Sequence, residues 1–431
     1  MKMNLVRAVL VASLSLFFVG AAFTPTPAVA AESAKPKLSK AASKPLVEAQ
    51  KASQAKDWPT MIAKAKEVLA MSDINDYDKY IANYFLGLAY YNTGDKASAA
   101  PAFYEAATST GASPEEHANA LKIAIELENE MKDYAKVIAL GQSAAQIGNV
   151  DSTVAAVVAI AYYNTADYPN AMAYAQKSID ADTAAGKLPD RGVYQVVLMV
   201  QNRQKNMAGE LKTLEIMASN YGNSEDWTNL IDVSVVSLPK SSVKDIAILY
   251  LFRLGLTVKA QMPDDDYVMM AGVALEPALH YPGDAQQALQ AGFNSGSLSQ
   301  AKGGALLSKA NAAAKSDEAS LSAVEAAAAK NPSAVGDVSV AEDYYGYGRY
   351  ADAARVAQRA ISKGGPKSTE AQLLLGVTQA KQGDDATATQ SLALVRGDAA
   401  LERAAQLWTI YTTRKYGKPA ATAPAAQPAA Q

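Results

Sequence analysis

The fold is decided by residues 88–95, LAYYNTGD, because the chain repeats them as residues 160–167, IAYYNTAD. The two copies begin 72 positions apart, which fits two units of about 36 residues. Gly94 supplies the backbone freedom that ends one helix, and Asp95 is a residue type that begins the next. The stretch therefore predicts a tight turn between two helices, repeated along the chain.

The residues around the first copy have the sizes that a packed helical hairpin needs. Gly87 and Ala99 are small, so two helix backbones can approach where they cross. Tyr90 and Phe103 are large and are expected to fill the space between this hairpin and the next. The pattern predicts helix on helix, with no need for a sheet.

The same turn-and-helix pattern recurs along most of the chain. The clearer copies lie at Lys132-Asp133-Tyr134, Ala166-Asp167-Tyr168, Gly283-Asp284, Gly348-Arg349-Tyr350 and Gly383-Asp384, and weaker ones at Lys56-Asp57-Trp58, Asn206 to Leu211 and Ser316 to Leu321. On these residues the chain resembles the tetratricopeptide repeat superfamily, although Asn83 and Gly111 occupy the positions of the signature tryptophan and proline. The resemblance implies an all-α fold, a right-handed superhelix (α-solenoid) of about eight to ten helical hairpins.

A more individual stretch lies between residues 226 and 298. It contains WTNLID at 227–232, LYLFRLG at 249–255 and DDDYVMMAGVAL at 264–275. With the flanking repeats, this order resembles a group of secreted proteobacterial repeat proteins over roughly residues 40 to 415. That resemblance implies the fold and export, and it supplies no activity.

The chain ends differ from the middle in composition. A basic start at Lys2 and Arg7, an apolar run, and Ala28-Val29-Ala30 predict a secretory signal peptide cleaved near Ala30. The best candidate for a second apolar span, residues 246–258, is interrupted by Arg253. The predicted organisation is a signal peptide (1–30), a flexible lead-in (31–43), N-terminal repeats (44–225), divergent helical repeats (226–298), C-terminal repeats (299–417) and a disordered Pro/Ala tail (418–431).

Composition limits the function. Removal of residues 1–30 leaves 38 Lys and Arg against 43 Asp and Glu, a net charge of about −5, and no basic stripe that would suit nucleic acid. The absence of cysteine excludes disulfides, thiolate catalysis and cysteine metal ligands. An exported protein of this kind is expected in the periplasm.

No catalytic or metal-binding pattern is convincing in the sequence. His117 and His280 are far apart and lack metal-ligand spacing. Residues 363–369, KGGPKST, have proline where a phosphate loop needs glycine, so Gly364 and Gly365 are better interpreted as a helix stop. The acidic groups at 73–78 and 264–266 could attract a hard cation, but acidic residues also favour helix starts. We therefore expect no cofactor, no metal and no enzyme.

Tyrosine is the one compositional oddity, with 22 Tyr against 7 Phe. Tyr90, Tyr162 and Tyr344 occupy the packing position of a first helix and are expected in the core. The next residues point roughly 100° away around a helix, toward the concave face of a tetratricopeptide array. The candidate ligand-binding residues there are Tyr91, Asn92, Tyr163, Asn164 and Tyr345.

Two interpretations of these tyrosines stay open. A ring beside an amide suits a peptide or a sugar, because it offers an apolar face together with donors and acceptors. Alternatively, the rings pack against the next repeat and bury an edge. The leading functional hypothesis is a non-enzymatic periplasmic protein or peptide interaction module, a scaffold or adaptor in the cell envelope. The alternative is a glycan-binding accessory protein of polysaccharide or peptidoglycan handling.

Overall fold

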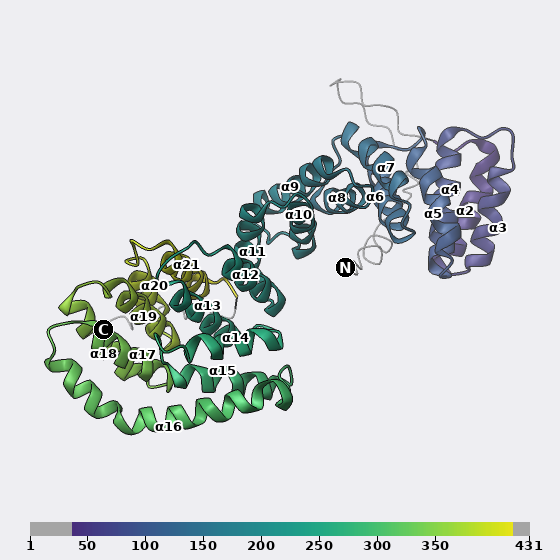
Figure 1. The fold of residues 1–431 in the computed structure, drawn as a ribbon. Coiled ribbons are helices and arrows are strands. Elements are labelled where there is room, and N and C mark those ends of the chain that lie inside the picture. Colours follow the sequence, from purple (N-terminus) through teal and green to yellow (C-terminus); the bar gives the residue numbers. More distant parts are fainter. Residues whose placement is uncertain (1–36, 417–431) are drawn as a thin grey trace, which may run out of the picture. The chain divides into compact units, whose positions relative to one another are not determined.

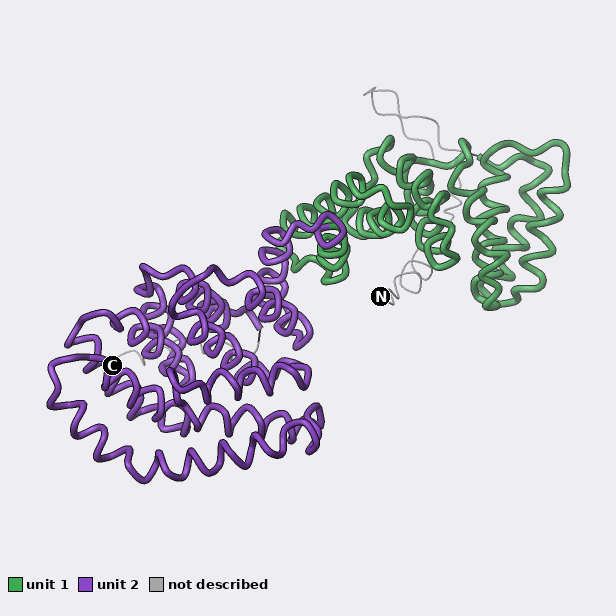
Figure 2. Tube along the Cα trace, viewed as in Figure 1, with its two compact units in different colours: residues 1–200 green, residues 201–431 purple. Residues whose placement is uncertain are grey.

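The computed structural model describes residues 37–416, so the predicted signal peptide, residues 31–36 of the predicted lead-in and the Pro/Ala tail lie outside the described residues. Within that range the chain forms twenty α-helices and no strand (Figure 1). It divides into two compact units, residues 1–200 and 201–431 (Figure 2). The expected all-α solenoid architecture is confirmed, whereas the boundaries predicted at 225/226 and 298/299 stay predictions.

The helices follow one another in chain order. Unit 1 contains α2 (Lys40–Gln54), α3 (Trp58–Leu69), α4 (Asp76–Asn92), α5 (Lys96–Thr108), α6 (Pro114–Glu130), α7 (Tyr134–Gln146), α8 (Ser152–Asn164), α9 (Tyr168–Ala184) and most of α10 (Arg191–Arg203). Unit 2 contains α11 (Met207–Tyr221), α12 (Ser224–Ser237), α13 (Lys244–Val258), α14 (Asp264–Ala274), α15 (Pro282–Ser295), α16 (Gln300–Lys330), α17 (Val335–Gly346), α18 (Tyr350–Lys363), α19 (Ser368–Lys381), α20 (Asp385–Leu392) and α21 (Ala399–Thr413).

The predicted turn is present in both copies of the repeated stretch. Gly94 adopts φ +84°, and Asp95 then caps α5 by accepting a hydrogen bond from the Ser98 amide at 3.0 Å. Ala166 adopts φ +61° in the second copy, where Asp167 caps α9 in the same way. A left-handed residue followed by an Asp cap is therefore the local device that closes these hairpins.

The helix crossing predicted at Gly87 is also confirmed. A Cβ atom at Gly87 would lie 2.6 Å from Cδ2 of Phe103, closer than carbon atoms can approach. Phe103 and Ala99 are fully buried. Only glycine leaves room for this phenyl ring where α4 and α5 meet. The hairpin therefore depends on steric fit as well as on the burial of apolar side chains.

Two of the expected repeat turns are wrong. Gly283 and Asp284 were expected to form a turn, but both lie in the first turn of α15, after its N-cap Tyr281. Residues Ser316 to Leu321 were expected to make a repeat turn, but they lie inside the continuous 31-residue helix α16. The segment has no glycine or proline to stop a helix, and alanine-rich sequence flanks it on both sides. α16 begins at the Ser299 cap, runs along α14, α15 and α17, and ends at Asn331 (Figure 1).

Within residues 37–416, no helix combines the length and the apolar character needed to span a membrane. The interrupted apolar stretch at residues 246–258 is α13, which is buried along most of its length in unit 2. Its arginine, Arg253, is buried together with carboxylate partners from α15 and α17.

Candidate functional site

The four predicted residues in unit 1 end two equivalent helices. Tyr91 and Asn92 are the last residues of α4, and Tyr163 and Asn164 are the last residues of α8. Both rings are half-buried and pack partly against the core, whereas both asparagines are exposed. The Tyr163 ring also lies 5.8 Å from that of Tyr168, across the hairpin turn. Both rings therefore bury part of their surface in the core, and whether the rest of that surface binds a ligand stays a prediction.

The asparagine amides are partly used by their own helices. Asn92 Nδ2 donates to the Leu88 carbonyl at 2.8 Å, and Asn164 Nδ2 donates to the Ile160 carbonyl at 2.8 Å. Each amide keeps its carbonyl oxygen and a second N–H for another partner, since asparagine carries two donors and an acceptor. Whether these groups bind a ligand stays a prediction.

Tyr345 does not lie on an open surface, which corrects its placement with the other candidates. It is 3% exposed, and the Arg253 guanidinium stacks over its ring at 4.2 Å. The physical reason is that α13 brings a buried cation to this position of α17, and the electron-rich ring face covers it. Tyr344, expected in the core, is buried as predicted.

Arg253 is the centre of a buried ionic cluster. Its Nε and Nη2 donate to the two carboxylate oxygens of Asp284, both at 2.7 Å, and its Nη1 donates to Glu342 Oε2 at 2.6 Å. Tyr250 completes the set, because its hydroxyl donates to Glu342 Oε1 at 2.5 Å. All four side chains are buried, so α13, α15 and α17 are joined by charge-assisted bonds in the interior of unit 2.

The cluster changes the acidity of its members. Burial raises the pKa of Glu342 above its usual value, although Arg253 and the Tyr250 hydroxyl act in the opposite direction. Asp343, the next residue, has its pKa raised to about 8 by burial and by the neighbouring carboxylates of Asp317 and Glu342. Unit 2 therefore holds a carboxyl group that is largely protonated at neutral pH.

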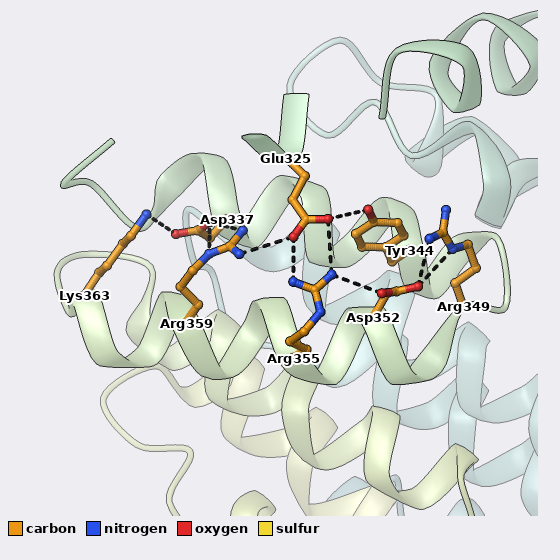
Figure 3. Close-up of polar contacts among 8 residues, drawn as sticks. All are labelled: Glu325, Asp337, Tyr344, Arg349, Asp352, Arg355, Arg359 and Lys363. Atoms are coloured by element: carbon orange, nitrogen blue, oxygen red, sulfur yellow. Dashed lines mark hydrogen bonds and ion pairs between the residues drawn. The ribbon is translucent and has the colours of Figure 1, made fainter. Parts of the chain in front are cut away.

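A second, partly exposed network ties α16 to α17 and α18 (Figure 3). Glu325 of α16 accepts from the Tyr344 hydroxyl at 2.5 Å and from Arg355 Nη1 at 2.6 Å, and it pairs with Arg359 at 3.2 Å. The hydrogen bond from Arg355 is the largest influence that lowers the Glu325 pKa to about 2. Buried Asp337 joins the same network through Arg359 at 2.9 Å.

The α18 side of this network is a stripe of charged residues at three- and four-residue spacing. Such spacing places side chains on one helical face. Its members are Arg349, Asp352, Arg355, Arg359 and Lys363 (Figure 3). The stripe faces α16 and α17, and each of its members makes an ion pair or hydrogen bond within the protein, so it acts as a structural clamp on the long helix.

A pocket of about 440 Å³ opens in unit 2 among α11, the end of α12 and the start of α21. Its apolar wall is formed by Leu211, Pro239 and Ala399. Its polar lining residues are Ser237, Arg396, Glu402, Arg403 and Gln406. This volume and mixed lining are within the range of ligand or side-chain pockets in proteins.

The remaining sequence candidates lie at helix ends. Asp264, Asp265 and Asp266 form the first turn of α14, as the helix-start interpretation predicted, and Lys302 bridges the first two. Asn75 and Asp78 form a capping box on α4. Among residues 37–416, no group of three or more His, Asp or Glu side chains could hold a metal ion.

The other two candidates also have local structural explanations. His117 Nε2 lies 2.6 Å from the Ala107 carbonyl. Gly364 caps the end of α18, and Ser368 begins α19, so residues 363–369 form the predicted helix stop.

Comparison with known proteins identifies the repeat. Residues 48–117 and 341–406 match the family model described as tetratricopeptide repeat. A search of curated proteins finds no match. Among solved structures, the APC/C hetero-tetramer Cut9–Hcn1 matches at 13% identity, covering 84% of this chain and 66% of that chain, with a TM-score of 0.25. The TPR domain of P58(IPK) matches at 11% identity, covering 85% and 97%, with a TM-score of 0.22.

Proposed function

This chain belongs to the tetratricopeptide repeat superfamily, with matched repeats in both compact units, and from that premise we propose a non-enzymatic interaction module of the bacterial envelope that binds a protein or peptide. Helical repeat arrays expose extended surfaces suited to recognition. Envelope location rests on the signal-peptide pattern of residues 1–30.

The observation that carries the proposal is the equivalence of two surface positions. α4 and α8 each end in a half-buried tyrosine followed by an exposed asparagine, at positions 72 residues apart. A repeated pair of an aromatic edge and an amide can engage successive stretches of an extended peptide, with the ring giving apolar contact and the amide giving backbone hydrogen bonds.

Site-specific photocrosslinking in living cells tests the proposal. A photoreactive amino acid replaces Asn92 or Asn164, and in matched controls it replaces exposed Glu105 on α5 or Lys177 on α9. We expect one defined protein to be captured from both asparagine positions and from neither control position. Capture that is equal at all four positions, or none at any, contradicts the proposal. Recovery of polysaccharide instead would favour the glycan-binding alternative.

A further inference from the structure

Two unusually exposed apolar side chains lie close in sequence to residues that line the pocket in unit 2. Val236 and Leu394 are 74% and 67% exposed, the two highest values among the large aliphatic side chains of the described residues. Val236 adjoins Ser237 of the pocket wall, and Leu394 lies two residues before Arg396 of the same wall. Single exposed apolar residues are ordinary, so these two add apolar surface to the segments that carry Ser237 and Arg396 and do not by themselves define a contact surface.

The three charged residues that line the pocket are compensated to different degrees within the chain. Arg403 pairs with Glu215 and also donates to Ser234 Oγ at 2.9 Å. Glu402 accepts the Gly397 amide at 2.8 Å and lies in the first turn of α21, where a negative charge is favourable. The Arg396 guanidinium donates only to the carbonyl of the preceding residue, Val395, at 2.6 Å. Among the described residues neither Arg396 nor Glu402 has an ion pair, but Glu402 is half-buried and held by an amide, whereas Arg396 is exposed.

We propose that this pocket binds a segment of a partner protein that inserts one apolar side chain and places an acidic residue beside Arg396. The wall formed by Leu211, Pro239 and Ala399 takes the apolar group, and a pocketed apolar anchor is the usual source of binding energy at an interface. Exposed, unpaired Arg396 supplies charge complementarity to a carboxylate. The inference rests on the proposed function only in taking the ligand to be a protein segment.

Selection from a displayed library of random heptapeptides on the purified full chain tests this inference. Three variants are selected in parallel with the parent protein. Arg396→Glu reverses the rim charge, and Ala399→Trp fills the pocket from an exposed position at the start of α21. Lys309→Glu, at an exposed position of α16 away from the pocket, is the matched charge control. Circular dichroism checks that all four proteins have the same helicity.

The parent protein and Lys309→Glu should enrich peptides in which an aliphatic or aromatic residue has Asp or Glu close by. Arg396→Glu should weaken the selected peptides about three- to tenfold, as expected when one surface attraction becomes a repulsion. Ala399→Trp should abolish the enrichment. No enriched peptide, or enrichment that persists unchanged in Arg396→Glu and Ala399→Trp, overturns the inference. Photocrosslinking at α4 and α8 is a separate readout in unit 1, so either proposal can fail alone.

Discussion

Substitution of Arg253 by Met should destabilise unit 2 severely. The change removes three hydrogen bonds of 2.6 to 2.7 Å and leaves the carboxylates of Asp284 and Glu342, both at most 2% exposed, without their cation. Breaking a buried ion pair by removing one partner costs about 3–5 kcal/mol, because the remaining charge is buried and uncompensated. A loss of this size is a large fraction of the stability of an ordinary domain.

The chain provides its own reporter for this experiment. It has three tryptophans, and Trp227 and Trp408 are fully buried in unit 2, whereas Trp58 lies in unit 1. The Trp408 indole donates to the Tyr250 carbonyl at 2.9 Å, beside the ionic cluster. Urea titration followed by tryptophan fluorescence in a Trp58→Phe background therefore measures unfolding of unit 2. The loss of stability should appear as a shift of the urea midpoint with no change in the slope of the free energy of unfolding against urea concentration.

Two controls separate the buried charge from loss of side-chain packing. Arg355→Met removes an arginine that is half exposed and should cost no more than about 1 kcal/mol. In Arg253→Met, Glu342 loses the cation that opposes the burial-raised pKa of its carboxyl group, so it should take up a proton in the folded state and the deficit should shrink as the pH falls from 7 toward 5. A loss below about 1 kcal/mol, or one that is the same at both pH values, would refute the uncompensated-charge explanation.

Two further predictions concern the other carboxyl groups of unit 2. Glu325→Gln should lower stability by about 1 kcal/mol at pH 7 and increase amide hydrogen exchange in the second half of α16. Because the Glu325 pKa is lowered to about 2, the stability advantage of the parent protein should vanish as the pH falls from about 4.5 toward 2. Unchanged hydrogen exchange would contradict the clamp. Asp343→Asn should raise the melting temperature at pH 8 but not at pH 4. The folded Asp343 pKa is raised to about 8, so the parent loses stability as pH rises from about 4 through 8, and parallel melting profiles would show that Asp343 is not the cause.

The hairpins could be predicted from sequence because their determinants are local. The turn at Gly94-Asp95 depends on one left-handed residue and one capping side chain, and both are visible within four positions. The same device operates with Lys132 at φ +61° before Asp133, where no glycine marks it. Glycine is thus not required for this turn, and it is not sufficient either, because Gly283-Asp284 lies inside α15.

The sites in unit 2 were not predicted because their partners are distant in sequence. Arg253 pairs with Asp284 and Glu342, 31 and 89 positions away, and its only sequence signal was a charge inside an apolar run. The pocket joins residues of α11 with residues of α21, and periodicity in one helix cannot show what another helix brings to it. The charged stripe of α18 was visible in its spacing, but its partner Glu325 was not.

The two tyrosines at equivalent repeat positions show how far a repeat pattern determines function. Tyr163 and Tyr345 follow the same signal, and each has a tyrosine five residues later, with ring centroids 5.8 and 5.3 Å apart. Tyr163 stays half-buried, whereas Tyr345 is enclosed because Arg253 covers its face. The repeat therefore determines the direction of the side chain, and the neighbouring helix determines whether a partner can reach it. A binding face in such an array has to be sought where a ring stays partly exposed, as Tyr91 and Tyr163 do at the ends of α4 and α8.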